Sequence, residues 1–225
     1  MDIFQVRLLR RLGLIVLSLV GLFVLNQIVL RISRRVHTAP MPPSKARWLD
    51  SPMRRRLFGT PEQIMDRAGV TPGMRVLEIG PGAGFFTVPL ARCVAAWGMK
   101  GSVTCVELQP EMIELLRQRL HAAKVDNVNI IQGDAQHLSL PEKSFDLVFL
   151  VTVLGEIVDP SALFSECARV LKPGGVLAVT EQVVDPDFRL PTTALKLATH
   201  AGLVESGCVG LPWWSYTARY YKPVG

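Results

Sequence analysis

The sequence predicts an α/β protein: a doubly wound, mostly parallel sheet that is preceded by one transmembrane helix. Three observations support this prediction. Nineteen residues without a charge lie between Arg11 and Arg31. From Thr60 onward, short apolar segments with strand character alternate with longer helical segments, as in parallel sheets. The first of these apolar segments runs into three alternate glycines, in the sequence VLEIGPGAGFFT at residues 76–87.

The uncharged stretch LGLIVLSLVGLFVLNQIVL is expected to form a membrane anchor within residues 1–35. A helix that rises about 1.5 Å per residue over this stretch roughly matches a hydrocarbon core of about 30 Å. Arginines flank it on both sides. Two alternatives stay open. One is a cleaved signal peptide, which the long apolar run and the lack of a clear cleavage site disfavour. The other is a buried or interfacial helix.

The formal net charge of +6 is unevenly distributed along the chain. Residues 1–60 contain eleven Lys or Arg and two acids, a net charge of +9. Residues 61–225 contain fourteen Lys or Arg and seventeen acids, a net charge of −3. An acidic main domain argues against a nucleic-acid surface. The basic flank that follows the apolar stretch predicts, by the positive-inside rule, a globular domain on the cytoplasmic side.

Residues 36–59 are rich in proline and arginine and are expected to be a linker, extended over residues 38–52. The arginines at 54–56, near the end of the linker, could bind lipid headgroups at about 1 kcal/mol each. The alternative is a solvated helix start without lipid contact. The segment from Trp48 to Phe58 could also form a lid, because it enters the domain directly before the first predicted helix.

Residues 60–225 are expected to form the globular domain. Thr60 and Pro61 have the pattern of an N-cap and a first helical residue, and Gly69 ends that helix. Strands are predicted at 74–79, 102–107, 128–132, 145–151, 176–181, 203–209 and 214–221. Further helices are predicted at about 84–97, 110–124, 160–171 and 190–201, with a turn at 172–175. Ligands of such sheets bind beyond the carboxyl ends of the strands. We therefore expect residues 78–86, 107–109, 134–135 and 150–156 to converge.

The glycines of the strand-to-helix turn would let a ligand approach the main chain. A dinucleotide fingerprint, GxGxxG, fails here because Phe85 stands where the third glycine belongs. The sequence instead contains the pattern ExGxGxG, which begins at Glu78. A carboxylate in the turn would repel a pyrophosphate and would suit a ligand that carries an ammonium or a sulfonium.

This pattern resembles the first motif of the class I S-adenosylmethionine-dependent methyltransferases, in particular the branch of the ubiquinone/menaquinone-biosynthesis (type 11) methyltransferases. GDAQHLSLP at 133–141, FDLVFL at 145–150 and LKPGG at 171–175 resemble further segments of that family in the same order. The resemblance covers about residues 60–225. It implies a seven-stranded sheet whose last strand is antiparallel, and S-adenosylmethionine as the cofactor.

The resemblance also assigns cofactor-binding residues by position. Residues of the glycine loop would line the methionine end of the cofactor; these are Glu78, Gly80, Gly82 and Gly84. Glu107, at the end of the second strand, would bind both ribose hydroxyls, and Leu108 beside it would pack on the adenine. Asp134 would accept from the adenine amino group, with Ala135 alongside. Phe85 and Phe86 are expected to pack in the core rather than on the cofactor.

A catalytic group is not identified by the sequence. Glu156, after the fourth strand, and Glu181, at the end of the fifth, are weak candidates, and a structural hydrogen bond is the alternative for Glu156. Trp213 and Trp214 could form an apolar lip over an acceptor or close the edge of the sheet. His137 is expected to be exposed. No metal site is expected, because the four cysteines are scattered and no Cys/His cluster is present.

Together these features predict a membrane-anchored methyltransferase that acts on a small or lipid-like hydrophobic acceptor, since a tethered domain is concentrated near molecules dissolved in the bilayer. A quinone precursor, a phospholipid amine or a hydrophobic thiol would fit. Two alternatives stay open: a catalytically silent cofactor-binding module at the membrane, and a protein or RNA methyltransferase. The expected partners are the membrane and the acceptor, without nucleic acid.

Overall fold

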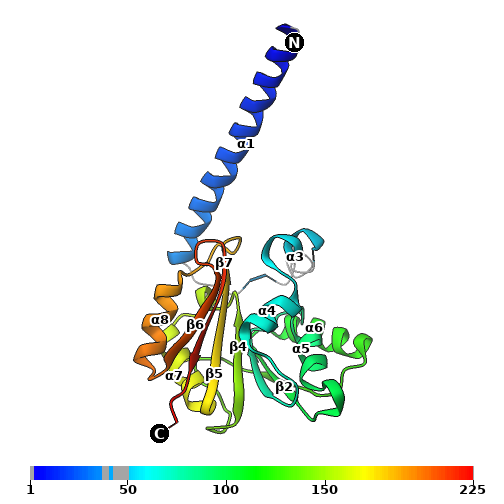
Figure 1. Ribbon diagram of the computed structural model, residues 1–225, viewed down its shortest axis with the longest axis vertical. Helices are drawn as coiled ribbons and strands as arrows, with labels where there is room; N and C mark the ends of the chain where they lie inside the picture. The colour runs from blue at the N-terminus through cyan, green and yellow to red at the C-terminus, as the bar shows by residue number, and fades with distance from the viewer. Residues whose placement is uncertain (1–2, 37–40, 43–50, 225) are drawn as a thin grey trace. The chain divides into compact units, whose positions relative to one another are not determined.

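The computed structural model describes residues 3–36, 41–42 and 51–224 (Figure 1). The chain divides into two compact units, Met1–Thr38 and Ala39–Gly225. Most of the predicted linker, residues 37–40 and 43–50, lies outside the described residues, and so does Trp48 of the predicted lid.

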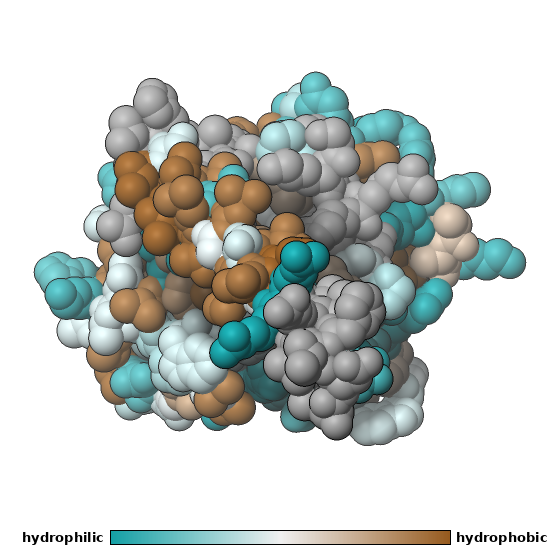
Figure 2. Space-filling view, turned by 90° about the horizontal axis from the view of Figure 1, so that it is seen from above, coloured by the Kyte–Doolittle hydropathy of each residue, from teal (hydrophilic) through white to brown (hydrophobic). Residues whose placement is uncertain are grey.

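The first unit is the helix α1, Ile3–Val36. Its segment Gly13–Ser33 is long and apolar enough to cross a membrane, by length and composition alone. The described side chains of this segment are almost all exposed, and they contribute to the brown, hydrophobic area of the space-filling view (Figure 2). A long apolar helix is typical of a membrane span, although a signal sequence passes the same test.

The second unit is built on one seven-stranded sheet with the order β3-β2-β1-β4-β5-β7-β6. The strands are β1 (Arg75–Ile79), β2 (Ser102–Glu107), β3 (Val128–Gln132), β4 (Phe145–Val151), β5 (Leu171–Gln182), β6 (Val204–Leu211) and β7 (Ser215–Tyr221). Strand β7 pairs antiparallel with both β5 and β6, whereas the pairs among β1 to β5 are parallel. The doubly wound, mostly parallel sheet is therefore confirmed, and so is its antiparallel last strand.

Helices cover both faces of the sheet (Figure 1). The α-helices are α3 (Pro52–Phe58), α4 (Pro61–Ala68), α5 (Thr87–Val94), α6 (Pro110–Ala123), α7 (Pro160–Val170) and α8 (Pro191–His200), and the 3-10 helices are η2 (Ala96–Gly98) and η3 (Leu154–Glu156). Helices α4, α5 and α6 belong to one hydrophobic cluster, and α7 and α8 belong to the other. The apolar side chains of β1, β4 and β5 are buried on both faces, as their near-continuous hydrophobicity predicts.

Among the predicted boundaries that differ from the structure, two differ for a clear local reason. Helix α5 begins at Thr87 rather than at Gly84, because Gly80, Gly82 and Gly84 all have positive φ and cannot continue a right-handed helix. Residues 172–175 do not form a separate turn but an irregularity inside β5, where the partner of the strand changes from Phe145 to Leu147.

Candidate cofactor-binding site

The loop between β1 and α5 brings bare main chain to the carboxyl edge of the sheet. Gly80, Gly82 and Gly84 have φ values of 64°, 53° and 83°. A Cβ at Gly80 would lie 2.7 Å from Val153, and one at Gly84 would lie 2.5 Å from Leu116, so these two glycines are required by packing. A Cβ at Gly82 would meet no protein atom within 4 Å. Gly82 is therefore the position at which a ligand can touch the backbone.

Glu107 joins this loop to the end of β2. Its buried carboxylate accepts hydrogen bonds from the amides of Gly82 and Gln109, each at 3.0 Å. A carboxylate offers about four acceptor positions, so two remain for other donors. The structure thus places two of the predicted cofactor residues, 25 positions apart in the sequence, in direct contact.

Glu78, at the end of β1, is buried behind the loop. Burial raises the pKa of its carboxyl to about 7, and the neighbouring charge of Glu107 adds to the effect. The thiol of Cys105 donates to it at 3.5 Å. A buried acid that is only partly ionised near neutral pH would be stabilised in its charged form by a nearby cation. The ammonium or sulfonium expected from the sequence has this charge.

The segment after β3 carries the other predicted contacts. Its position beside β2 is fixed by the amide of Gly133, which donates to the carbonyl of Glu107 at 3.0 Å. Asp134 accepts hydrogen bonds from the main-chain and side-chain amides of Gln136, and these bonds lower the pKa of the Asp134 carboxyl. Ala135 is buried, whereas Leu108 is exposed. Leu108 therefore presents an apolar surface at the mouth of the site.

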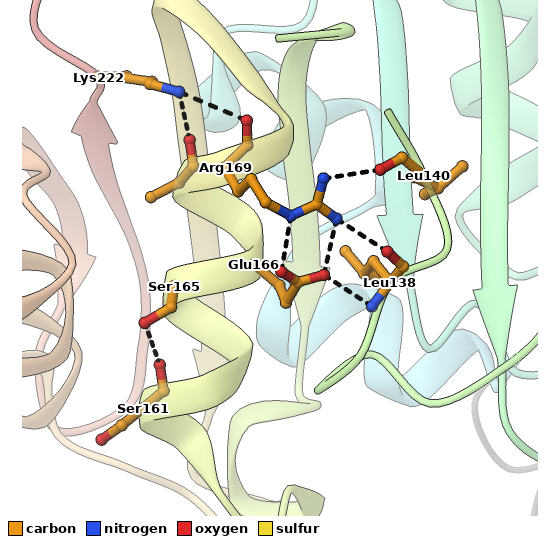
Figure 3. Close-up of polar contacts among 8 residues, drawn as sticks. Leu138, Leu140, Ser161, Ser165, Glu166, Arg169 and Lys222 are labelled. Carbon is orange, nitrogen blue, oxygen red and sulfur yellow. Dashed lines mark hydrogen bonds and ion pairs between the residues drawn. The ribbon is translucent and has the colours of Figure 1, made fainter. Parts of the chain in front are cut away.

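A polar network that sequence reasoning missed holds this segment in place (Figure 3). Arg169 of α7 donates to the carbonyls of Leu138 and Leu140, both at 2.8 Å, and forms an ion pair with Glu166 at 2.7 Å. Glu166 in turn accepts from the amide of Leu138 at 2.7 Å. Hydrogen bonds to main-chain carbonyls cannot be predicted from a sequence pattern. The only sequence signal near Arg169 is the family segment LKPGG, which begins two residues after it.

Two elements border the opposite side of the predicted site. After β4, Thr152 has a positive φ of 54°, a sparsely populated conformation for a β-branched residue, and the 3-10 helix η3 follows it. A Cβ at Gly155 would overlap the backbone of Asp187, so η3 packs tightly on the loop after β5. The structure thus brings residues 150–156 to the same edge as the glycine loop, as predicted. Glu156, half-buried in η3, has an interaction partner.

Glu181 ties these two loops together from the end of β5. One carboxyl oxygen accepts from the amide of Arg189 at 3.1 Å, and the carboxyl also interacts with the amide of Leu154. Burial raises the pKa of the Glu181 carboxyl well above its usual value, and the nearby charge of Asp185 adds to the effect. A buried carboxyl that accepts from one loop and lies against the other is placed to support both.

Three buried polar atoms at this edge find no hydrogen-bond partner among the described residues. They are Oε1 of Glu181, Oε1 of Gln182 and Oγ of Ser215. Gln182 and Ser215 are paired across β5 and β7. Buried polar atoms are nearly always satisfied, and exceptions gather where a ligand or water completes the site. The end of β5 and the start of β7 are therefore candidates for an acceptor-binding wall.

The segment before the domain also reaches this edge, where the sequence predicted a linker. The carbonyl of Met41 accepts from the side chain of Gln109 at 3.1 Å, and Met41 packs on Ala83 and Met112. Ser51 accepts from the amide of Arg54 as the N-cap of α3. The Ser-Pro pair at the start of α3 is the sequence signal that could have revealed this helix.

The predictions for Phe85, Phe86 and His137 agree with the structure. Phe85 and Phe86 are buried in a hydrophobic cluster, and their rings meet edge to face with centroids 4.9 Å apart. His137 is exposed. Trp213 is exposed and Trp214 is half-buried at the β6–β7 turn. Among the described residues there is no cluster of three or more potential metal ligands.

Comparison with known proteins identifies relatives of the domain. A family profile described as "Methyltransferase domain" matches residues 77–179. The ubiquinone/menaquinone biosynthesis C-methyltransferase UbiE of Shewanella piezotolerans is 35% identical over 118 residues, 52% of this chain and 46% of that protein. The demethylmenaquinone methyltransferase of Staphylococcus aureus is 32% identical over 120 residues, 53% of this chain and 48% of that protein. The chain thus spans about half the length of the curated relatives it matches.

A solved structure agrees with the fold. A SAM-dependent methyltransferase from Aquifex aeolicus superposes with a TM-score of 0.71 at 24% sequence identity, over 80% of this chain and 98% of that one. At this identity the similarity establishes the fold alone.

Glu78 gives a test of the electrostatics of the site. Its carboxyl is protonated in both the folded and the unfolded chain below its usual pKa of 4.5, but above about pH 7 the folded chain must hold a buried charge. Glu78→Gln should therefore gain stability relative to the native chain as the pH rises through this window, by about 3 kcal/mol at pH 8. Denaturant unfolding of the full chain in micelles at pH 4.5, 6 and 8 measures the difference.

The exposed Glu114→Gln is the control for this measurement, and its effect should not vary with pH. A Glu78→Gln difference that is constant from pH 4.5 to 8 would contradict a raised pKa at this position.

The arrangement of the site fits S-adenosylmethionine, the cofactor of the matched family. Gly82 leaves room against bare backbone, Glu107 retains acceptor positions for hydroxyls, and Glu78 supplies a buried carboxylate suited to a cation. The sheet order, the family profile and the relatives agree with a methyltransferase fold and with this cofactor. Residues 77–179 therefore form a methyltransferase domain of the class I S-adenosylmethionine-dependent type, similar to that of UbiE.

Proposed function

We propose that this chain transfers a methyl group from S-adenosylmethionine to a hydrophobic, quinone-like or lipid-like acceptor at a membrane. The observation that carries the proposal is the hydrogen bond between the amide of Gly82 and the carboxylate of Glu107. It joins the glycine loop and the acid of β2 at one edge of the sheet, and this combination suits a nucleoside that carries a positive charge.

Each predicted cofactor residue has a proposed role that its surroundings support. The glycine loop and Glu78 would hold the methionine end, with the carboxylate balancing its charge. Glu107 would accept from both ribose hydroxyls with its two remaining acceptor positions. Asp134, fixed by Gln136, would accept from the adenine amino group. Gly80 and Gly84 would shape the loop, and Ala135 and Leu108 would contact the adenine ring.

The bound cofactor supplies an electrophilic methyl group, so the protein mainly has to hold an acceptor atom about 3 Å from it. Glu181 is suited to supporting the loops around the acceptor, because its buried carboxyl accepts from the amide of Arg189 and lies against Leu154 of η3. Glu156, on η3, remains the second candidate for a group that faces the acceptor.

The proposed acceptor class rests on two independent observations. The curated relatives are named as ubiquinone/menaquinone and demethylmenaquinone methyltransferases. Independently, Gly13–Ser33 is suited to crossing a bilayer, and the chain after it is basic. We propose residues 1–35 as the anchor, 36–59 as the linker and 60–225 as the methyltransferase domain, with this domain on the cytoplasmic side. A tethered domain would meet acceptors dissolved in the same membrane at high local concentration.

Methyl transfer to separated fractions tests the proposed function. The full chain, supplied with S-adenosylmethionine labelled in its methyl group, should label the lipid extract of its host membranes and leave the RNA and protein fractions unlabelled. Gly82→Val, which adds a side chain where the cofactor would contact the backbone, should remove the label. Label in the RNA or protein fraction alone would contradict the acceptor class, and no label in any fraction would favour the catalytically silent module.

Gln182 tests the acceptor wall. Its side-chain oxygen is buried without a partner among the described residues, so Gln182→Leu should leave the stability unchanged or raise it by about 1 kcal/mol. The same change should raise KM for the acceptor several-fold and leave the Kd for S-adenosylmethionine unchanged. Steady-state kinetics and calorimetry separate the two constants. If KM for the acceptor did not change, Gln182 would have no part in acceptor binding.

A further inference from the structure

We propose that the methyltransferase domain has a membrane-docking surface of its own, formed by α3 and the β6–β7 turn and directed at an anionic bilayer. We define this docking surface by its exposed side chains: Met53, Arg55, Arg56, Leu57, Leu211 and Trp213. The inference rests on the membrane anchoring in the proposed function but does not depend on methyl transfer.

Two aromatic side chains hold the helix and the turn together. The ring of Trp214 stacks on Phe58, with centroids 5.0 Å apart and an interplanar angle of 18°. The indole N–H of Trp214 donates to the carbonyl of Leu57 at 3.0 Å. Figure 1 shows α3 and the start of β7 at the same end of the sheet. Because Phe58 is buried and its partner is half-buried, the helix presents its opposite face to solvent.

That outer face is apolar. Met53 is 63% exposed and Leu57 is 48% exposed, and the turn adds Leu211 at 51% and Trp213 at 63%. Met53 and Leu57 are four residues apart, so they lie on one side of the helix. Apolar side chains of this size are seldom grouped on the surface of a domain without a binding role. Tryptophan in particular is enriched at the membrane–water interface.

The charges around this face favour an anionic lipid surface over another occupant. Helix α3 contains three consecutive arginines and no acid, although residues 61–225 carry a net charge of −3. Arg55 and Arg56 are exposed, and Arg55 also lies over the ring of Phe85 at 5.1 Å. Apolar side chains flanked by arginine are the composition of a helix that lies in the headgroup region. Each arginine near an anionic bilayer contributes about 1 kcal/mol, roughly a fivefold gain in binding.

The chain itself would keep this surface near a bilayer. The candidate span ends at Ser33 and α3 begins at Pro52, 19 positions later. A chain of that length reaches at most about 65 Å. A domain on so short a tether meets the membrane at a high effective concentration, and even weak lipid contacts then become occupied.

The location of the surface gives it a functional consequence. The carbonyl of Trp214 accepts from the amide of Val183 at 2.7 Å, directly after β5, and Ser215 pairs with Gln182. The docking surface therefore adjoins the proposed acceptor wall. When it contacts the bilayer, an acceptor can pass from the lipid to Gln182 and Ser215 with little exposure to water.

Hydrogen exchange of the full chain in lipid nanodiscs tests the proposal. Peptides that cover 52–58 and 211–214 should exchange about tenfold more slowly in discs that contain phosphatidylglycerol than in discs of phosphatidylcholine alone. Reversal of charge in the double variant Arg55→Glu/Arg56→Glu should remove this protection. Trp213→Ser should weaken it several-fold.

Two matched controls lie at the opposite edge of the sheet. Trp97 is exposed in η2, before β2, and Lys124 is exposed after α6. Trp97→Ser removes an exposed indole and Lys124→Glu reverses an exposed positive charge, and both should leave the protection unchanged. Loss of protection in these controls to the same degree would overturn a localised surface.

The remaining outcomes separate this inference from the proposed function. If the chain floats with the discs but 52–58 and 211–214 exchange equally fast in both lipids, the docking surface is wrong and the anchor stands. Equal protection in micelles without phosphatidylglycerol, together with a dimer in solution, would assign the surface to a second copy of the chain. A chain that does not float with lipid at all would contradict both the anchor and the docking surface, whatever its methyltransferase activity.

Discussion

The hydrogen bond from the amide of Gly82 to the carboxylate of Glu107 is the interaction on which the proposed site depends. It requires a positive φ at Gly82, a β2 that ends in an acid, and a parallel register that brings the two strand ends level. A Cβ at Gly82 would meet no described protein atom within 4 Å, so packing does not require a glycine there. The loop therefore has a shape that the fold alone does not require, and binding of a ligand explains it.

The carboxyl edge of the sheet combines a polar half and an apolar half. Around β1 and β2 lie the carboxylates that we propose to bind a charged nucleoside, and the Arg169 network keeps the segment after β3 in position. Around β5 and β7, buried polar atoms that have no hydrogen-bond partner among the described residues lie beside a turn whose outer face is apolar. This division suits a reaction between a water-soluble cofactor and an acceptor that is dissolved in lipid.

Much of the domain could be predicted from the sequence, because its signals are local. Apolar segments marked the strands, and Gly80, Gly82 and Glu107 stood at their ends, where a parallel sheet must bring them together. Long-range contacts between residues of ordinary type could not be predicted. The stacking of Phe58 on Trp214 joins positions 156 residues apart, and the bonds of Arg169 end on main-chain carbonyls. The irregularity at 172–175 also depends on the register with β4.

The most direct test of the account is calorimetry of the full chain in micelles with S-adenosylmethionine and with its demethylated product. We expect both to bind. Glu107→Ala should weaken binding at least about tenfold because two ribose hydroxyls lose their acceptor, and the exposed Glu114→Ala should bind like the native chain. A native chain that gives no heat with either compound, or a Glu107→Ala variant that binds as tightly as the native chain, would contradict it.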